Sequence, residues 1–233
     1  MNELTINGRF MGPPTMGNGG YVAGLLARPL GNQAQVRLHR SVPVDRPLRW
    51  QQAVSGQIRL CDGAALIAEA NPAYLGMSIP RRPAYAAVVA AQQAQPYGSD
   101  HPFPDCFVCG PNRNGGDGLG LQPIYLPKYD LVAATWLPDE SLANGEGLVA
   151  AEFLWAALDC PGGMAAVGQR PRPILLGQIT ARVTEGIRAG ERCLVLGWLI
   201  DRQGRKYIVG TALFDENGDV CGRACAIWLE PGQ

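Results

Sequence analysis

The segment with the strongest structural signal is Leu148-Val-Ala-Ala-Glu-Phe-Leu-Trp-Ala-Ala-Leu-Asp-Cys-Pro-Gly-Gly163. Its apolar residues would cover most of the circumference of a helix, which indicates a helix buried on nearly all sides. Glu152 and Asp159 lie seven positions apart, about two turns at 3.6 residues per turn, so they share one face. The segment therefore predicts a buried helix that carries two carboxylates.

Asp159 stands where a carboxylate is unexpected. The following Pro161-Gly162-Gly163 predicts that the helix ends or kinks, and a carboxylate near a helix C-terminus opposes the helix dipole. A buried acid in such a place needs either a compensating partner or a chemical role. One interpretation is that Asp159 caps whatever follows Pro161. The other is that it serves catalysis.

Composition sets the outer limits of the interpretation. The chain has 233 residues, of which 47% are hydrophobic and 17% charged, as expected for one large or two small globular domains. The formal net charge is zero and basic runs are short, so neither nucleic acid nor membrane is expected as a partner. The first residues lack the pattern of a signal peptide, and seven cysteines, an odd number, indicate reduced thiols. We expect a cytoplasmic protein.

The expected elements follow one order twice. The first part is predicted to contain a strand over 4–10, a turn-rich loop, a helix over 21–30 with Asn18 as its N-cap, and strands over 35–44, 48–60 and 64–79. Residues 80–105 form a linker with a short helix over 84–95. The second part is predicted to contain strands over 119–126 and 131–137, the central helix from about Gly147, and strands over 174–187, 192–201, 206–215 and 220–229.

The repeated order suggests a duplication. A helix that is apolar all round, with one strand before it and several antiparallel strands after it, needs a sheet wrapped around it, which is the hotdog arrangement. We therefore expect an α+β double hotdog, in which two antiparallel sheets each wrap a central helix and form a pseudo-dimer in one chain. The expected units are residues 1–80 and 105–233, joined by the linker 81–104.

One loop and two helix segments carry a family resemblance. Cys106-Phe-Val-Cys-Gly-Pro-Asn112, continuing to Gly118-Leu119, resembles the opening of bacterial hotdog thioesterases of the phenylacetate-pathway type. In that family a His-Gly-Gly or Asn-Gly-Gly starts the central helix, and a catalytic Asp lies seven residues after the second Gly. Leu158-Asp159 matches the acid end of this pattern, but Ala150-Ala151-Glu152 replaces the glycine end. Asn18-Gly19-Gly20-Tyr21 matches the glycine end, but Ala27 replaces the acid.

This reciprocal loss has a geometric meaning. Seven residues of helix span about 10 Å, so the two ends of one helix cannot reach the same carbonyl group. In a paired hotdog each site would take its glycine N–H from one helix and its acid from the antiparallel neighbour. A fused pair that has lost half of each site retains a single composite site, combining Gly19 and Gly20 with Asp159.

The resemblance implies hydrolysis of an acyl thioester, carried by CoA or by an acyl-carrier protein, without a cofactor. The N–H groups of Gly19 and Gly20 would hold the oxyanion, and Asp159 would act as general base or as nucleophile. Gln178 is expected to place the water molecule. Further candidate substrate contacts are Asn18, Tyr21, Thr180 and Trp155, the last of which is also a natural core residue. Such chains could associate further as homo-oligomers.

Other interpretations fit the sequence less well. Zinc binding by Cys106 and Cys109 would need Cys221 and Cys225, whose spacing on a strand suits chelation poorly, so no metal is expected. The two histidines, His39 and His101, lie in unpromising places for a serine hydrolase triad or for a hydratase or dehydratase. A non-catalytic acyl-thioester-binding protein remains the alternative from another class.

Overall fold

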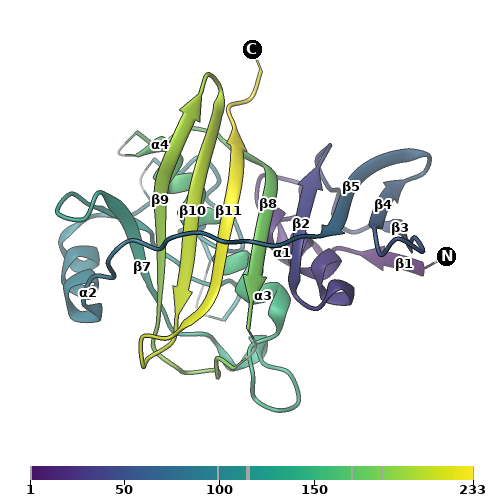
Figure 1. Ribbon diagram of the computed structural model, residues 1–233. Helices are drawn as coiled ribbons and strands as arrows, with labels where there is room; N and C mark the ends of the chain where they lie inside the picture. The colour runs from purple at the N-terminus through teal and green to yellow at the C-terminus, as the bar shows by residue number, and fades with distance from the viewer. Residues whose placement is uncertain (1, 99, 114–115, 169, 185, 233) are drawn as a thin grey trace.

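The structure, a computed structural model, describes residues 2–98, 100–113, 116–168, 170–184 and 186–232. Within these ranges eleven strands form one antiparallel sheet in the order β1-β3-β4-β5-β2-β8-β11-β10-β9-β7-β6 (Figure 1). The strands are β1 (Asn2–Thr5), β2 (Gln33–Leu38), β3 (Pro47–Gln52), β4 (Ile58–Asp62), β5 (Ala65–Pro72), β6 (Ile124–Leu126), β7 (Leu131–Trp136), β8 (Leu175–Val183), β9 (Cys193–Gln203), β10 (Lys206–Phe214) and β11 (Val220–Leu229).

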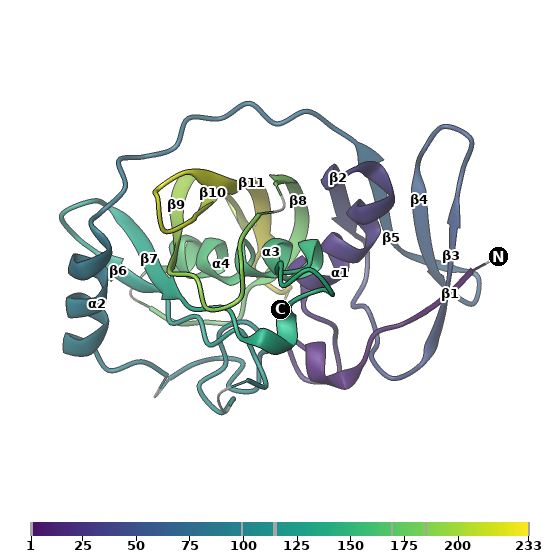
Figure 2. The same cartoon turned by 90° about the horizontal axis from the view of Figure 1, so that it is seen from below.

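Four α-helices accompany the sheet in the described part of the chain: α1 (Gly19–Ala27), α2 (Tyr85–Ala94), α3 (Ala151–Ala157) and α4 (Cys160–Val167). Short 3-10 turns occupy Gly8–Phe10, Arg28–Leu30 and Glu140–Leu142. Helices α1, α3 and α4 lie on the concave side of the curved sheet, whereas α2 lies at its β7 end (Figure 2).

No helix among the described residues is long and apolar enough to cross a membrane.

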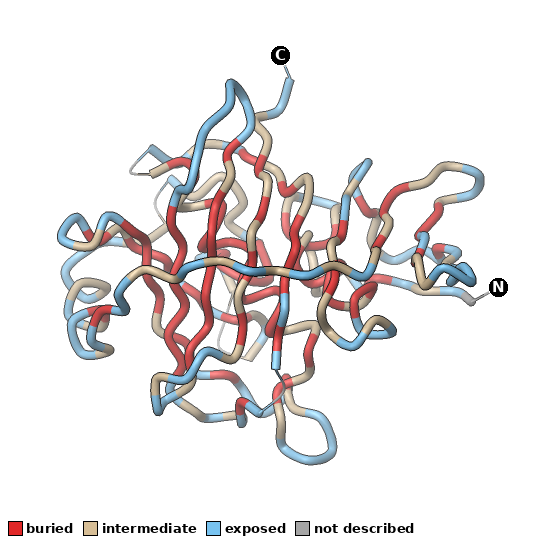
Figure 3. Tube along the Cα trace, in the orientation of Figure 1, coloured by how far each residue is buried: buried red, intermediate tan, exposed pale blue. Residues whose placement is uncertain are grey.

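The main core lies between the sheet and the three helices of its concave side. In β11 every second residue from Gly222 is buried, whereas β9 and β10 contain continuous buried runs. In the tube representation the buried residues gather in the middle of the sheet and in the helices behind it (Figure 3). Trp155 and Leu158 of the α3 region are fully buried, which agrees with the expectation of a helix surrounded by apolar neighbours.

The sheet repeats one strand order on either side of the pair β2–β8. Outward from β2 the neighbours are β5, β4, β3 and β1, and outward from β8 they are β11, β10, β9 and β7. On one side, β2 is the first strand after α1; its neighbours outward are the fourth, third and second strands after that helix, and then β1, which precedes it. On the other side, β8 follows α4 in the chain, and its neighbours are arranged in the same way, with β7 as the strand that precedes the helices. The two directions meet where Val36 pairs with Ile179 in antiparallel register.

Two expectations about the sheet need correction. Two separate sheets were predicted, but pairing of β2 with β8 joins the strands into one. Residues 48–60 were predicted as one strand, but they contribute to two, β3 and β4, which pair as a hairpin. Gly56 in the connecting turn has a φ of +86°, a conformation that glycine adopts without steric cost.

The central helix also differs from its expected course. It was predicted to run from about Gly147 to Cys160, but α3 ends at Ala157 and a second helix, α4, begins at Cys160. Pro161 lies in the first turn of α4, where a missing N–H costs no intrahelical hydrogen bond. Proline therefore starts a new helix here, and Asp159 stands between the two.

The connection after β5 begins earlier than predicted, because the strand expected over 64–79 ends at Pro72. Residues 73–84, which we call the strap, run across the convex side of the sheet from β5 to α2 (Figures 1 and 2). The strap's Met77 and Ile79 pack on a second, smaller core that includes Val88 of α2 and Phe214 of β10. The helix expected over 84–95 is confirmed as α2.

Candidate functional site

The site forms where α1 and α3 cross at very close range. A Cβ placed on Gly20 would lie 2.5 Å from Asp159 Cβ, and one on Gly24 would lie 2.6 Å from Glu152 Cα. Moving forward along α1 thus means moving backward along α3, so the helices are antiparallel. Glycine at positions 20 and 24 allows this contact, since any side chain there would push the backbones apart.

Asp159 is held by one of its two carboxylate oxygens. Its Oδ2 accepts hydrogen bonds from the backbone N–H of Gly20 and from Asn18 Nδ2, both at 2.9 Å. Asp159 is only 2% exposed. Among the described residues, Oδ1 has no hydrogen-bond partner. The carboxylate is therefore fixed in orientation and keeps one oxygen available for chemistry.

Asn18 connects the helix start with the acid. It is the N-cap of α1, as predicted, and its Oδ1 accepts from the backbone N–H of Tyr21 at 2.9 Å. Its amide nitrogen then points to Asp159 Oδ2. Because one side chain makes both bonds, the cap fixes the amide orientation that the carboxylate requires.

Burial governs the protonation of this acid. Desolvation raises the pKa of Asp159 to about 7, although the hydrogen bond from the Gly20 N–H opposes this, as does the weaker one from Asn18. The proximity of Cys106 adds to the rise. A carboxyl group with a pKa in this range can take up and release a proton near neutral pH.

The break between α3 and α4 is stabilised from the sheet. Thr211 of β10 is buried, and its hydroxyl donates a 2.9 Å hydrogen bond to the carbonyl oxygen of Leu158. This carbonyl lies at the helix end, where carbonyls lack intrahelical partners. Thr211 therefore holds the turn that presents Asp159.

A cavity of about 660 Å³ opens beside the acid. Asn18, Gly19 and Asp159 form part of its wall, and Leu176 of β8 forms another. Its lining is mainly apolar, and three exposed basic residues complete it: Arg40, Arg205 and Lys206. We call these three residues the basic rim. A long apolar cavity with charged residues at its edge suits a ligand with an apolar and an anionic part.

The structure brings some predicted site residues together and places others elsewhere. Asn18, Gly19, Gly20 and Asp159 meet, although Gly20 does not line the cavity. Tyr21 stacks on Phe10 with ring centroids 4.2 Å apart, and Trp155 is fully buried in the core. Neither of these two lines the cavity.

Gln178 and Thr180 lie on the other face of their strand. In β8, Ile179 and Ala181 are buried in the main core, so the alternating residues point to the convex side. There Thr180 Oγ1 accepts a hydrogen bond from Gln35 Nε2 at 3.3 Å. Neither Gln178 nor Thr180 lines the cavity, so the water-placing role expected for Gln178 has no support in its position.

Three cysteines and a histidine that the sequence did not assign to the site lie beside the acid. Cys106, Cys109, Cys160 and His101 all line the cavity. The sequence did hold one signal: Cys160 directly follows Asp159, so any pocket around the acid would include it. The proximity of the Cys106 loop to α4 is a long-range contact that spacing alone does not reveal.

Comparison with known proteins places the fold. Neither a protein-family model nor a curated protein matches this chain. Solved structures are similar over nearly the whole length: 99% of this chain aligns with 95% of a putative thioesterase from Novosphingobium aromaticivorans, at a TM-score of 0.64 and 13% identity. A tesB protein of Mycobacterium avium subs paratuberculosis aligns over 99% of this chain and 92% of its own, at a TM-score of 0.62 and 10% identity.

A third solved structure carries the name of the fold. It is a conserved protein of unknown function with hot dog fold from Alicyclobacillus acidocaldarius, which aligns over 99% of this chain and 93% of its own, at a TM-score of 0.60 and 10% identity. At such identities the likeness concerns the fold. The chain is thus a hotdog-fold protein, as expected from its sequence.

Proposed function

We propose that the chain is a double hotdog that hydrolyses an acyl thioester at one composite site between its two units. The main support for this proposal is the carboxylate of Asp159, which lies on the wall of a large apolar cavity. Its Oδ2 accepts two hydrogen bonds, and its Oδ1 has no partner among the described residues. The repeated strand order around β2–β8 and the antiparallel α1 and α3 support the assignment of two units.

The chemistry uses groups that the two helices contribute separately. Asp159 Oδ1 would accept a proton from water as the water oxygen bonds to the thioester carbonyl carbon. The resulting tetrahedral intermediate collapses, the C–S bond breaks, and the proton passes to the leaving thiolate, which gives a carboxylic acid and a thiol. In the nucleophilic route the same oxygen would bond to the carbonyl carbon, and the C–S bond would break to release the thiolate, which takes a proton from solvent. Water would then cleave the resulting anhydride, which gives the carboxylic acid and restores the Asp159 carboxyl group.

Gly19 and Gly20 have different roles in this proposal. The N–H of Gly20 donates to Asp159 and so orients the base. Gly19 lines the cavity and lies in the first turn of α1, where backbone N–H groups lack intrahelical acceptors. We assign the Gly19 N–H to the developing oxyanion, which the positive end of the helix dipole stabilises as well.

The cavity also indicates what kind of thioester fits. Apolar walls suit an acyl chain, and the basic rim suits the phosphates of a phosphopantetheine carrier, which CoA and acyl-carrier protein share. Arg172 is a weaker candidate for this contact, because it already pairs with Glu230 at 3.1 Å.

The alternatives make different demands on the site. A hydratase or dehydratase would need a histidine free to move a proton. His101 lines the cavity, but its Nδ1 accepts from the Phe103 N–H at 3.1 Å and its Nε2 lies 3.4 Å from Cys109 Sγ. Both ring nitrogens of His101 are thus engaged. His39 also lines the cavity, and its Nε2 lies 3.2 Å from Glu69 Oε1. A non-catalytic binder would hold acyl thioesters without turnover.

A hydrolysis screen across acyl-CoA chain lengths, followed by one variant pair, tests the proposal. We expect Asp159→Asn to lower kcat by about 10²–10⁴-fold and to leave acyl-CoA binding, measured by calorimetry, nearly unchanged. Glu152→Gln is the matched control, because Glu152 lies on α3, shortly before Asp159, and does not line the cavity; its effect should be mild. Wild-type binding without turnover would establish the binder instead, and full activity of Asp159→Asn would exclude this mechanism.

A further inference from the structure

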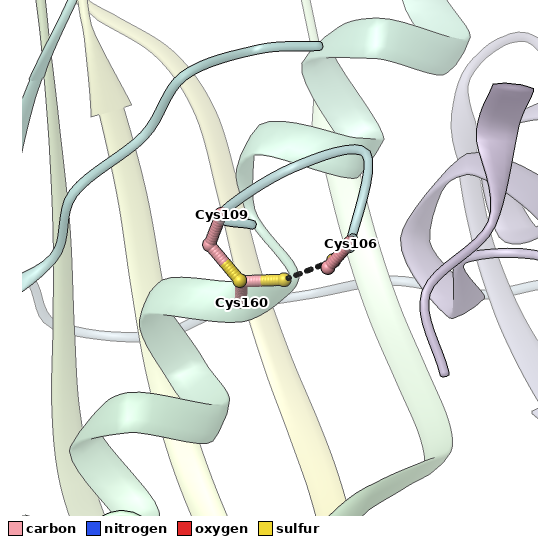
Figure 4. A group of neighbouring side chains, drawn as sticks. All are labelled: Cys106, Cys109 and Cys160. Carbon is pink, nitrogen blue, oxygen red and sulfur yellow. Dashed lines mark hydrogen bonds between the residues drawn. The ribbon is translucent and has the colours of Figure 1, made fainter. Parts of the chain in front are cut away.

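Three buried cysteines converge next to the candidate site. Their Sγ atoms, from Cys106, Cys109 and Cys160, all lie within 4.8 Å of one another, and those of Cys106 and Cys160 are 3.7 Å apart. Figure 4 shows two of them on one tight loop and the third on the start of α4, with the three side chains directed at one another. The proposed hydrolysis makes no use of these thiols.

The loop that carries two of the cysteines has the form of a metal-binding turn. Cys106 and Cys109 are three positions apart, and the N–H of Gly110 donates to the Cys106 carbonyl at 2.8 Å. A Cβ on Gly110 would lie 2.5 Å from the Cys106 nitrogen, so this closed turn requires glycine. The backbone N–H groups of Cys109 and Val108 also donate hydrogen bonds to the Cys106 sulfur. N–H groups aimed at a sulfur stabilise a thiolate.

The spacing of the sulfurs matches tetrahedral coordination. Zinc–sulfur bonds of about 2.3 Å at tetrahedral angles separate the ligands by about 3.8 Å, close to the 3.7 Å between Cys106 and Cys160. Two thiols brought together for packing alone need no third thiol and no N–H donors. The third cysteine and the donors thus point to a cation at the centre.

His101 belongs to the surroundings of this cluster. Its Nδ1 accepts from the Phe103 N–H, which leaves the ring proton of the neutral imidazole on Nε2. That nitrogen lies 3.4 Å from Cys109 Sγ and can donate to it. A histidine in this position supports a thiolate ligand through a hydrogen bond and does not itself bind the metal.

We propose that Cys106, Cys109 and Cys160 bind one zinc-type divalent cation through three thiolates, with the fourth position taken by a ligand from the cavity. All three cysteines line that cavity, so a cation can enter and a fourth ligand can reach it. Soft thiolate ligands select zinc over magnesium or calcium. This site does not include Cys221 and Cys225, and it does not depend on the proposed hydrolysis.

Cobalt titration of the reduced, chelator-treated full-length protein tests the site. We expect one equivalent of Co²⁺ to produce the charge-transfer absorption of cobalt bound to thiolates, and Zn²⁺ to displace it. Replacing any of the three cysteines by serine should weaken zinc binding by more than about a hundredfold, and His101→Ala by about ten- to a hundredfold. Asp159→Asn should keep full stoichiometry, so that loss of hydrolysis and loss of the metal site are separately visible.

Cys225→Ser and Cys221→Ser are the controls, since neither residue lines the cavity, and both should bind cobalt as the wild type does. The wild-type titration needs no variant to fold, which keeps the test valid if a cysteine variant is unstable. Absence of the charge-transfer band in the reduced wild type would overturn the proposal. So would an equal loss of affinity in Cys225→Ser.

Discussion

Asp159 combines two requirements that usually conflict in one side chain. It is anchored firmly by the Gly20 N–H and the Asn18 amide at Oδ2, and it keeps Oδ1 without a partner among the described residues. A buried oxygen without a hydrogen bond costs stability. Such a cost persists where an atom has a task, so the unpartnered oxygen is the strongest argument for chemistry at this residue.

Substitutions at Asn18 can separate its role as N-cap of α1 from its hydrogen bond to Asp159. Asn18→Ala removes both and should lower the free energy of unfolding by about 1 kcal/mol, together with a loss of kcat, because Asp159 loses one of its two donors. Asn18→Ser keeps an N-cap oxygen for the Tyr21 N–H but lacks the amide that reaches Asp159. We expect urea denaturation of Asn18→Ser near that of the wild type and a kcat as low as that of the alanine variant. Equal activity of the serine variant and the wild type would contradict the role given to the amide.

Thr211 offers a prediction about the turn behind the acid. Thr211→Val keeps the shape of the side chain but leaves the buried Leu158 carbonyl without its hydrogen bond, which should cost about 1–3 kcal/mol of stability. Because this turn orients Asp159, kcat should fall as well. Thr211→Ser retains the hydroxyl and should restore most of the activity. A valine variant with unchanged denaturation would mean that the hydrogen bond is unimportant.

At the scale of elements, the closeness of α1 and α3 is the feature most sensitive to substitution. Gly20→Ala would place a Cβ 2.5 Å from Asp159 Cβ and 2.8 Å from the Trp155 carbonyl oxygen. The helices would have to separate, at a cost of about 1–3 kcal/mol, and the Gly20 N–H would move away from the carboxylate. Thermal denaturation and kcat should both report this.

The control for that substitution is Gly145→Ala. Nothing lies within 4 Å of a Cβ at Gly145, and its φ is not in the left-handed region. Its stability and activity should equal those of the wild type. If Gly20→Ala behaved like this control, the close helix contact would not be a requirement of the site.

Local patterns predicted most elements, and the errors have physical reasons. Apolar runs and turn residues located β7, β10 and β11 well, although only β11 alternates along its length, whereas β7 and β10 are buried at nearly every position. The hairpin within 48–60 was missed, although Ser55-Gly56 in its turn is a recognised turn pair. The start of α4 was not predicted, because Pro161-Gly162-Gly163 indicates that a helix ends or kinks there, although proline is also favoured at a helix start.

The site was predicted in part for a similar reason. Asn18, Gly19, Gly20 and Asp159 carry a motif and a fixed spacing, and the structure brings them together. The role predicted for Gln178 depended on which face of its strand is turned toward the helices. The register in β8 shifts opposite Ile227 and Trp228, and a shift of one residue reverses every side chain. Sequence spacing does not contain this information.

On the scale of the whole molecule, attraction of an anionic substrate must come from local charge. The formal net charge is zero, so the basic rim is the source that the cavity offers. We expect Arg205→Gln and Lys206→Gln to raise KM for acyl-CoA up to several-fold, since an exposed ion pair contributes up to about 1 kcal/mol, with kcat unchanged. Steady-state kinetics at low and high salt should show a weaker salt dependence in the variants.

Arg59→Gln serves as the control for charge alone, because Arg59 is exposed on β4 and does not line the cavity. It should leave KM as in the wild type. An equal rise in KM from all three variants would indicate a general effect of net charge rather than a contact at the rim.

The pairing of β2 with β8 has a consequence for how this protein can change over generations. In a symmetric assembly of identical chains every mutation appears in each copy, so a substitution that helps one copy of a pocket is forced on the other. Here a single gene encodes both sides of the cavity, and a mutation at position 19 or 159 alters one wall once. Each wall is therefore inherited and selected on its own. The glycines lie on α1 and the acid follows α3, so an engineer can redesign one side of the pocket while the other stays as it is.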